Sequence, residues 1–286
     1  MMATRSLIDR EQLCLRVREL PALPQAALEA LAMLRDEEAS AERCGELIAR
    51  DQALLARTLC LANSAFYGVP GRVGSIRDAV HLLGRRALIS LLTVATVSRQ
   101  FDQHSCPQFV FAGFWRHAMA VALASHGLAR VLEADEDLAF TSGLLHDIGR
   151  LALAAHFPAE MGAAIARSHT VDAGLASIEH EILGTDHVEV AAQVAAQWKF
   201  PPEVVQAIAG HHAPAAAAGG GPSLADIVHV ADAMAHALDL TEDPNEMVPA
   251  IHGAAWERLA LSPRVCLKVF HDTETGVAAL CQAMSL

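Results

Sequence analysis

Histidine and aspartate side chains recur inside apolar, helix-forming segments of the second half of this sequence. The adjacent pair His146–Asp147 lies in the middle of the run GLLHDIGRLAL at residues 143–153. Burying two polar side chains costs several kcal/mol unless a partner satisfies them. Imidazole nitrogen and carboxylate oxygen are common protein ligands of divalent transition metals. The pair therefore predicts a buried metal site.

Further residues of the same chemistry lie on, or at the end of, apolar helical segments. Because their neighbours are apolar, we expect these side chains to be drawn to the interior as well. An ordered series of His, His–Asp, His, His–His and Asp is far more specific than an isolated pair. The predicted metal ligands are His117, His146, Asp147, His187, His211, His212 and Asp232.

The adjacent pairs favour a site for two ions. Neighbouring residues of a helix do not face each other, so His146 and Asp147 reach one ion only at a distorted helix end. They more readily serve two ions, with Asp147 between them. Two ions roughly 3.5–4 Å apart can activate water and clamp the oxygens of a phosphate ester. We expect divalent transition metals, and Fe, Mn, Zn, Ni and Co all suit such ligands.

Single histidines outside this series are expected to have structural roles. A lone histidine on an apolar helix usually forms a hydrogen bond within the core. This expectation applies to His126, His156, His169, His180, His229, His236, His252 and His271.

Helical periodicity runs along nearly the whole sequence, and no alternation typical of hairpin strands is present. Ala and Leu supply most of the 53% hydrophobic content, and aromatic residues make up only 5%. Such a composition favours closely packed helices. Helices are expected at 24–37 and 85–101, and two short helices are expected to be separated near Asp51. Ser75 and Gly84 are expected to cap one helix, and Gly149 is expected to let another helix or a ligand approach closely. The predicted fold class is all-α.

A polar break at residues 101–108 predicts two helical lobes. The N-terminal lobe would span 1–105, and the metal-site lobe would span 106–286. A second break at 213–223, APAAAAGGGPS, is expected to be a loop. Near the C-terminus we expect two helices, at 246–261 and 262–284, and the second could instead consist of two short helices that meet near Asp272.

Charge and composition exclude several classes of function. A formal net charge of −12 argues against binding of nucleic acid through phosphates, which requires a basic face. The six cysteines are scattered, as expected for reduced thiols. Neither a signal peptide nor a membrane-spanning segment is predicted, so we expect a cytoplasmic protein without a membrane partner.

The second half resembles the HD superfamily of metal-dependent phosphohydrolases, whose signature is H…HD…D. The first half resembles the HDOD family, the HD-related output domain of bacterial signalling proteins. Its motifs are LPALP at 20–24, IARDQALLARTLCLANSAFYG at 48–68 and SIRDAVHLLGRRAL at 75–88. The resemblance implies a multi-helix HD-type bundle with an additional N-terminal helical lobe.

The resemblance extends to the related HD-GYP cyclic di-GMP phosphodiesterases. It implies a metal-ligand role for the same seven residues, and Arg150 stands where those enzymes carry a lysine, so it keeps a positive charge that could meet a phosphate. Two positions depart from the pattern. Residues 213–223 replace the charged and aromatic GYP signature, and Gly113 replaces a glutamate that binds a third metal in some relatives. A third ion and cyclic di-GMP turnover are therefore not expected.

Three functions follow from these observations. The first is a bacterial signalling module with a metal site, acting through a partner protein or a bound nucleotide. The absent GYP signature and the lack of a fused receiver or effector domain favour it. The second is an active phosphohydrolase on a nucleotide or cyclic nucleotide, in which Asp147 bridges the ions and Arg150 steadies the phosphate. The third is a helical scaffold without metal.

Overall fold

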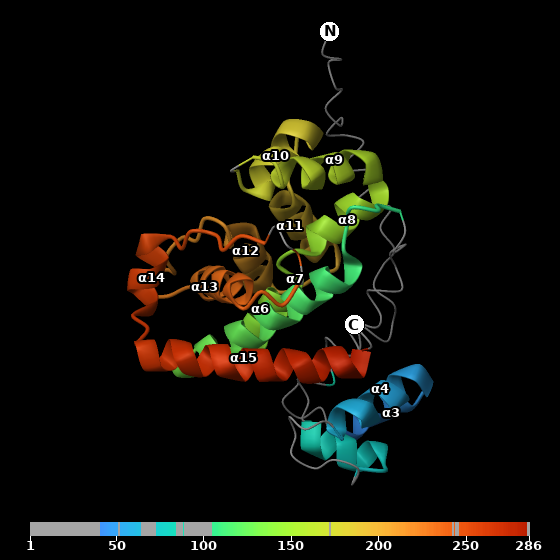
Figure 1. Ribbon diagram of the computed structural model, residues 1–286. Helices are drawn as coiled ribbons and strands as arrows, with labels where there is room; N and C mark the ends of the chain where they lie inside the picture. The colour runs from blue at the N-terminus through green and yellow to red at the C-terminus, as the bar shows by residue number, and fades with distance from the viewer. Residues whose placement is uncertain are drawn as a thin grey trace. The chain divides into compact units, whose positions relative to one another are not determined.

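The computed structural model describes residues 41–50, 52–63, 73–83, 88, 105–171, 173–241, 243 and 246–284 (Figure 1). These residues form helices joined by turns and loops and include no strand, which confirms the all-α prediction. They divide into two compact units. One consists of the described residues of 101–270, and the other consists of those of 21–100 together with 271–286. The predicted lobes 1–105 and 106–286 remain a prediction.

The unit formed by 21–100 and 271–286 contains α3 (Ala41–Ala49) and α4 (Gln52–Ala62), two helices separated near residue 51 as expected. Asn63 ends α4: its Nδ2 donates to the carbonyls of Leu59 and Val73, both at 2.9 Å, and its Oδ1 accepts from Val73 N at 3.0 Å. The Ser75 hydroxyl accepts from Asp78 N at 3.1 Å, which confirms the predicted cap. The expected helices at 24–37 and 85–101 and the Gly84 cap lie outside the described residues.

The 101–270 unit contains the predicted metal ligands. Its helices are α6 (Phe111–Val131), α7 (Glu136–Leu145), α8 (Ile148–His156), α9 (Pro158–Ser168), α10 (Leu175–Leu183), α11 (His187–Gln197), α12 (Pro202–Gly210), α13 (Leu224–Ala237), α14 (Gly253–Leu259) and the first part of α15 (Pro263–Met284). In this unit α6 packs against α7 and α13, while α11 packs against α8 and α12 (Figure 1).

Glycines allow these helices to approach each other closely. A Cβ at Gly143 of α7 would lie 2.7 Å from the Val121 carbonyl of α6. A Cβ at Gly149 of α8 would overlap the carbonyl oxygen of His187 in α11. The expectation that Gly149 permits a close approach is therefore confirmed, and the approaching group is the backbone of a predicted metal ligand.

Local hydrogen bonds fix where the ligand-bearing helices begin. Asp186 accepts from Glu189 N and caps α11 immediately before His187. Ser223 and Asp226 form a reciprocal capping box at the start of α13. The His146–Asp147 pair occupies the junction at which α7 ends and α8 begins. At such a helix end the two side chains could also reach a single ion, so the adjacency of the pair does not by itself require two ions.

The C-terminal elements differ from expectation. The helix predicted at 246–261 is limited to α14, because residues 246–250 are not helical. The helix expected at 262–284 is α15, which continues through Asp272 without a break. The alternative of two short helices is not observed, because a single aspartate costs a helix interior only roughly a few tenths of a kcal/mol, which neighbouring helix formers offset. The expected loop at 213–223 is confirmed.

Among the described residues, no helix has the length and apolar character that crossing a bilayer requires.

Candidate metal centre

All seven predicted ligands converge in the 101–270 unit, although α7 to α12 lie between the helix of His117 (α6) and the helix of Asp232 (α13) in the chain. Three groups of them have potential ligand atoms within 4.8 Å of one another, and one of these groups, His146, Asp147 and His211, shares a residue with each of the other two. We call His117, His146 and Asp232 the first trio, and His187, His211 and His212 the second trio. Asp147 lies between them.

The first trio joins α6, the end of α7 and α13. Oδ1 of Asp232 lies 3.0 Å from Nε2 of His117 and 3.6 Å from Nε2 of His146. Both of these ring nitrogens are buried and have no aligned hydrogen-bond partner. His146 Nδ1 donates to the Gly143 carbonyl at 2.8 Å, so a neutral His146 turns the lone pair of Nε2 toward the aspartate.

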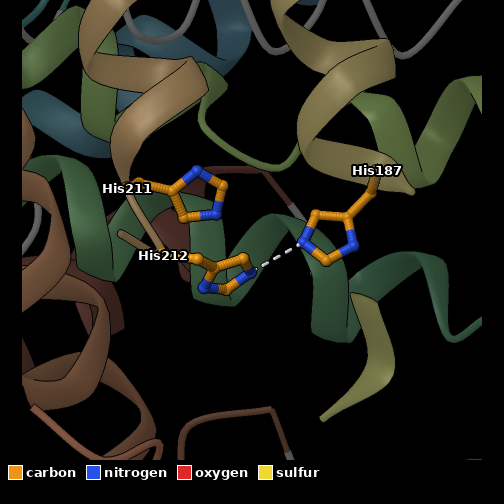
Figure 2. Close-up of side chains that lie close together, drawn as sticks. All are labelled: His187, His211 and His212. Carbon is orange, nitrogen blue, oxygen red and sulfur yellow. Dashed lines mark hydrogen bonds between the residues drawn. The ribbon is translucent and has the colours of Figure 1, made fainter. Parts of the chain in front are cut away.

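The second trio places His187 at the start of α11 opposite the adjacent pair at the end of α12 (Figure 2). Nε2 of His187 lies 3.0 Å from Nε2 of His212. Nδ1 of His211 donates to the Ile208 carbonyl at 2.7 Å, and its Nε2 is buried without a partner. Backbone carbonyls thus orient His211 as they orient His146, with one nitrogen free for a ligand bond.

Asp147 contacts both trios with one oxygen. Its Oδ1 lies 3.7 Å from Nε2 of His146, 3.4 Å from Nε2 of His187 and 3.8 Å from Nε2 of His211. These separations exceed hydrogen-bond length, yet ligands about 2 Å from a shared ion lie roughly 3–4 Å apart. The other oxygen accepts from Arg150 Nη1 at 3.0 Å.

Electrostatics keep both aspartates ionised. Burial alone would raise the pKa of each carboxyl group. The histidines around Asp147, together with Arg150, hold its pKa well below its usual range, and His117 and His146 do the same for Asp232. Asp147 and Asp232 therefore offset the positive charge of Arg150 and of any protonated histidine in the site.

The histidines of the second trio differ in their affinity for protons. Burial, aided by His187, lowers the pKa of His212 to about 4, and burial also lowers that of His211. Burial opposes protonation of His187 too, but Glu179 and Asp147 outweigh it and raise its pKa to about 9. Without metal, protonated His187 can donate both to Glu179 and to neutral His212. A metal ion would replace the proton on Nε2.

Three residues near the centre were missed by sequence reasoning. Glu179 is fully buried and accepts from both the backbone N and the Nδ1 of His187, at 2.8 and 2.6 Å. Its only signal is its position on the apolar face of α10. His236, expected to be structural, has its Nε2 3.5 Å from Asp232 Oδ1 and its Nδ1 2.7 Å from Oε1 of Glu246, which orients the ring. Its signal is the spacing of four residues from Asp232, which places both on one face of α13.

Of the other seven lone histidines, one is buried, His126 and His156 are half-buried, and four are exposed. His229 is buried, donates to the His211 carbonyl at 2.7 Å and accepts from His252 N at 2.8 Å, which confirms its structural role. The expectation of core burial was wrong for four histidines because they lie on solvent-facing surfaces of their segments. These exposed residues are His169, His180, His252 and His271.

A pocket of about 670 Å³ opens onto the centre. Its lining includes Asp147, Arg150, His212 and Asp232, and its walls come partly from residues 241, 243 and 246–250. The donor set fits a transition metal, since it offers imidazole and carboxylate groups, and Nε2 of His117, His146 and His211 has no aligned hydrogen-bond partner. The pocket would give a small molecule access to such a metal.

The family model of the HDOD domain matches residues 20–214. The chain belongs to the HDOD domain family. The match covers more than half of the chain, and it confirms the resemblance seen in the motifs of the first half.

Solved structures share the fold of this HDOD protein. A phosphohydrolase candidate from Shewanella amazonensis SB2B is 30% identical, with a TM-score of 0.73 over 95% of this chain and 97% of that chain. A candidate signal transduction protein from Marinobacter aquaeolei VT8 is 25% identical, with a TM-score of 0.76 over 99% of this chain and 68% of that chain. An HDOD domain protein with unknown function from Geobacter sulfurreducens, 22% identical, shares the fold with a TM-score of 0.76 over 97% of this chain and all of that chain.

Curated relatives are similar over shorter stretches. An uncharacterized protein of Treponema pallidum is 26% identical over 208 residues, or 69% of this chain. Ribonuclease Y of Bacillus thuringiensis is 33% identical over 97 residues, or 34% of this chain. The aligned regions span only 38% and 14% of the lengths of these two relatives.

Proposed function

We propose that this HDOD protein is a bacterial signal-transduction module whose centre binds two divalent transition-metal ions, one at each trio. The observation that carries the proposal is the position of Asp147 Oδ1, within 3.8 Å of ring nitrogens from both trios. One carboxylate can thus be shared by two ions. The similarity to a candidate signal transduction protein over 99% of this chain supports the regulatory role.

The orientation of the side chains supports metal binding in preference to a hydrogen-bonded scaffold. Nε2 atoms of His146 and His211 are buried without a hydrogen-bond partner, and Nε2 of His117 lies 3.0 Å from Asp232 Oδ1 without the alignment of a hydrogen bond. Leaving such groups unpaired costs about 1–3 kcal/mol each, and a metal ion removes that cost. A bound metal would act as a Lewis acid toward phosphate oxygens and acidify bound water.

A small-molecule signal would enter through the pocket. Its volume of about 670 Å³ lies within the range of ligand sites, roughly 300–1,000 Å³. Arg150 lines the pocket, and its guanidinium can bind phosphate oxygens while it remains paired with Asp147. A phosphate-containing nucleotide therefore fits the charge of the site. The module would pass on the bound state through a partner protein.

A second candidate function, hydrolysis of a nucleotide phosphoester, is favoured by the same access of the pocket to the centre. In that reaction Arg150 would orient the phosphate and both aspartates would remain ionised. The similarity to the Shewanella phosphohydrolase candidate, 30% identical over most of both chains, adds support. The missing GYP signature argues against cyclic di-GMP as the substrate.

Metal content tests the proposal. We expect about two equivalents of transition metal in protein purified without an affinity tag, and loss of at least one in Asp147→Asn, measured by elemental analysis. Asp239→Asn is the matched control, because Asp239 is exposed and has a φ of 51°, a conformation that asparagine tolerates. Absence of metal after reconstitution with Mn, Fe, Zn, Ni or Co would contradict the proposal.

Turnover distinguishes the two functions. The metal-loaded protein is incubated with bis(p-nitrophenyl) phosphate and with cyclic mononucleotides and dinucleotides. The regulatory proposal predicts binding of a nucleotide without product formation. Product formation that is lost in Asp147→Asn and reduced in Arg150→Lys would instead establish hydrolysis as the function.

A further inference from the structure

His236 lies against the first trio, although it belongs to neither the seven-residue series nor the HD signature. Its Nε2 is 3.5 Å from Oδ1 of Asp232, the same oxygen that faces His117 and His146. Its ring centroid is 4.4 Å from that of His117. Three imidazole rings therefore surround the volume in front of one carboxylate oxygen.

The partner of the other ring nitrogen determines what Nε2 can do. His236 Nδ1 is 2.7 Å from Oε1 of Glu246, a side chain that is only 7% exposed. An ionised carboxylate only accepts hydrogen bonds, so Nδ1 carries the proton and a neutral His236 has its lone pair on Nε2. The 3.5 Å separation from Asp232 is too long for a good hydrogen bond but suits two ligands of one ion.

The second trio contains the same arrangement. His187 Nδ1 is held by buried Glu179 at 2.6 Å, and its Nε2 faces Asp147 at 3.4 Å. In each case a carboxylate orients an imidazole whose other nitrogen faces an aspartate of the centre. Metal-bound histidines commonly have such a carboxylate partner, which fixes the tautomer and raises ligand basicity.

We propose that His236 is an additional ligand of the ion at the first trio and that Glu246 is the residue that positions it. The inference rests on the proposed function, because it requires an ion at this trio. The first ion would then have His117, His146, His236 and Asp232 as protein ligands. A fourth protein ligand occupies a position that water would otherwise take, as in closed, structural sites. This favours regulation over hydrolysis at the first ion.

Cobalt titration tests the assignment. Metal-free wild type, His236→Ala and Glu246→Ala are titrated with Co²⁺, with visible absorption reporting the ligand environment and elemental analysis reporting stoichiometry. A His212→Ala background, which weakens the second site, isolates the first ion. We expect His236→Ala to lower the affinity of the first site for Co²⁺ by at least about 10-fold and to change the absorption spectrum of the bound ion. Glu246→Ala should lower this affinity about 10-fold while the spectrum keeps its shape.

Two further variants guard against trivial explanations. His126→Ala is the matched control, because His126 forms a similar pair with Glu136 at 3.0 Å but takes no part in either trio. It should bind Co²⁺ like wild type. His236→Gln keeps a polar side chain of similar length if the alanine variant does not fold, and it should show the same weakening.

The outcomes separate the two claims. Wild-type protein that binds no Co²⁺ overturns the proposed function and this inference together. If wild type binds two ions and His236→Ala binds the first ion with unchanged affinity and spectrum, the inference alone is overturned. Three ions in wild type would also overturn it, since His117, His236 and Glu246 would then hold an ion of their own.

Discussion

At the scale of the residue, the second ring nitrogen decides the role of each histidine. Carbonyl oxygens of Gly143 and Ile208 hold Nδ1 of His146 and His211, and Glu179 holds Nδ1 of His187. Each leaves Nε2 directed at the centre. His229 has both nitrogens occupied by backbone groups and is therefore a structural residue. Orientation by the neighbours, more than residue type, separates candidate ligands from core histidines.

The coupling of His187 to Glu179 predicts a pH-dependent stability of the metal-free protein. The pKa of His187 is raised from 6.5 to about 9, so its protonation favours the folded state. This contribution is fully present below pH 6.5 and is lost as the pH rises through about 9. Glu179→Gln removes the negative charge that does most to raise the pKa of His187. We therefore expect the unfolding free energy of the variant to fall less steeply than that of wild type between about pH 7 and pH 9.5. Urea unfolding in the presence of a chelator measures it.

Glu189→Gln is the control for this experiment. The Glu189 carboxylate accepts a hydrogen bond from the Thr185 hydroxyl at 2.9 Å, so its partner is Thr185 and not His187. The variant should keep the wild-type slope. Equal slopes for wild type and Glu179→Gln would show that Glu179 does not control the proton on His187.

At the scale of the element, helix ends position most of the candidate ligands. His146 ends α7, Asp147 precedes α8, His187 begins α11 and His211 follows α12. Helix ends allow neighbouring side chains to diverge, which a regular helix prevents. The close approach of α8 to α11 at Gly149 then brings Asp147 and His187 within 3.4 Å.

Gly149→Ala should disrupt this approach. Its Cβ would overlap the His187 carbonyl and lie 2.7 Å from Ala191 N, both of them backbone atoms that cannot rotate away. We expect a loss of about 1–3 kcal/mol in unfolding free energy, together with weaker metal binding at the second trio. Urea unfolding and metal titration measure the two effects.

The matched control is Gly253→Ala at the start of α14, where an added Cβ meets nothing within 4 Å. Alanine should be neutral or slightly stabilising there. A Gly149→Ala protein as stable as Gly253→Ala would show that α8 and α11 can separate without cost.

At the scale of the whole molecule, the seven predicted metal ligands lie entirely within the 101–270 unit. The sequence has three tryptophans, Trp115, Trp198 and Trp256, and all lie in that unit. Tryptophan fluorescence therefore reports unfolding of the part of the chain that carries the centre. This separates its stability from that of the other unit without dissecting the protein.

Metal removal should lower the midpoint temperature of this unfolding transition. A ligand that binds only the folded state at 100 to 1,000 times its Kd contributes about 3–4 kcal/mol. We expect a chelator to lower the fluorescence-detected Tm of wild type and to leave that of metal-free Asp147→Asn nearly unchanged. An equal Tm for wild-type protein with and without chelator would argue that no metal contributes to its stability.

The sequence by itself determined the all-α fold class, the helix breaks near residue 51 and at 213–223, the Ser75 cap and the close approach at Gly149. These features are local, because periodicity, capping and glycine geometry act over a few neighbouring residues. The motifs also led to the HDOD family. The chemistry of the seven predicted ligands was likewise readable, although their role in binding metal remains a prediction.

Only the tertiary structure decided which side chains meet. His229 and His236 flank Asp232 by three and four residues on the same face of α13, and no local pattern distinguishes them. Packing gives His229 two backbone partners and sets His236 against Asp232. It also buries Glu179 behind His187 and divides the ligands into two trios about Asp147. These outcomes depend on how helices cross and where they end, and such long-range geometry is not encoded in the spacing of any single segment.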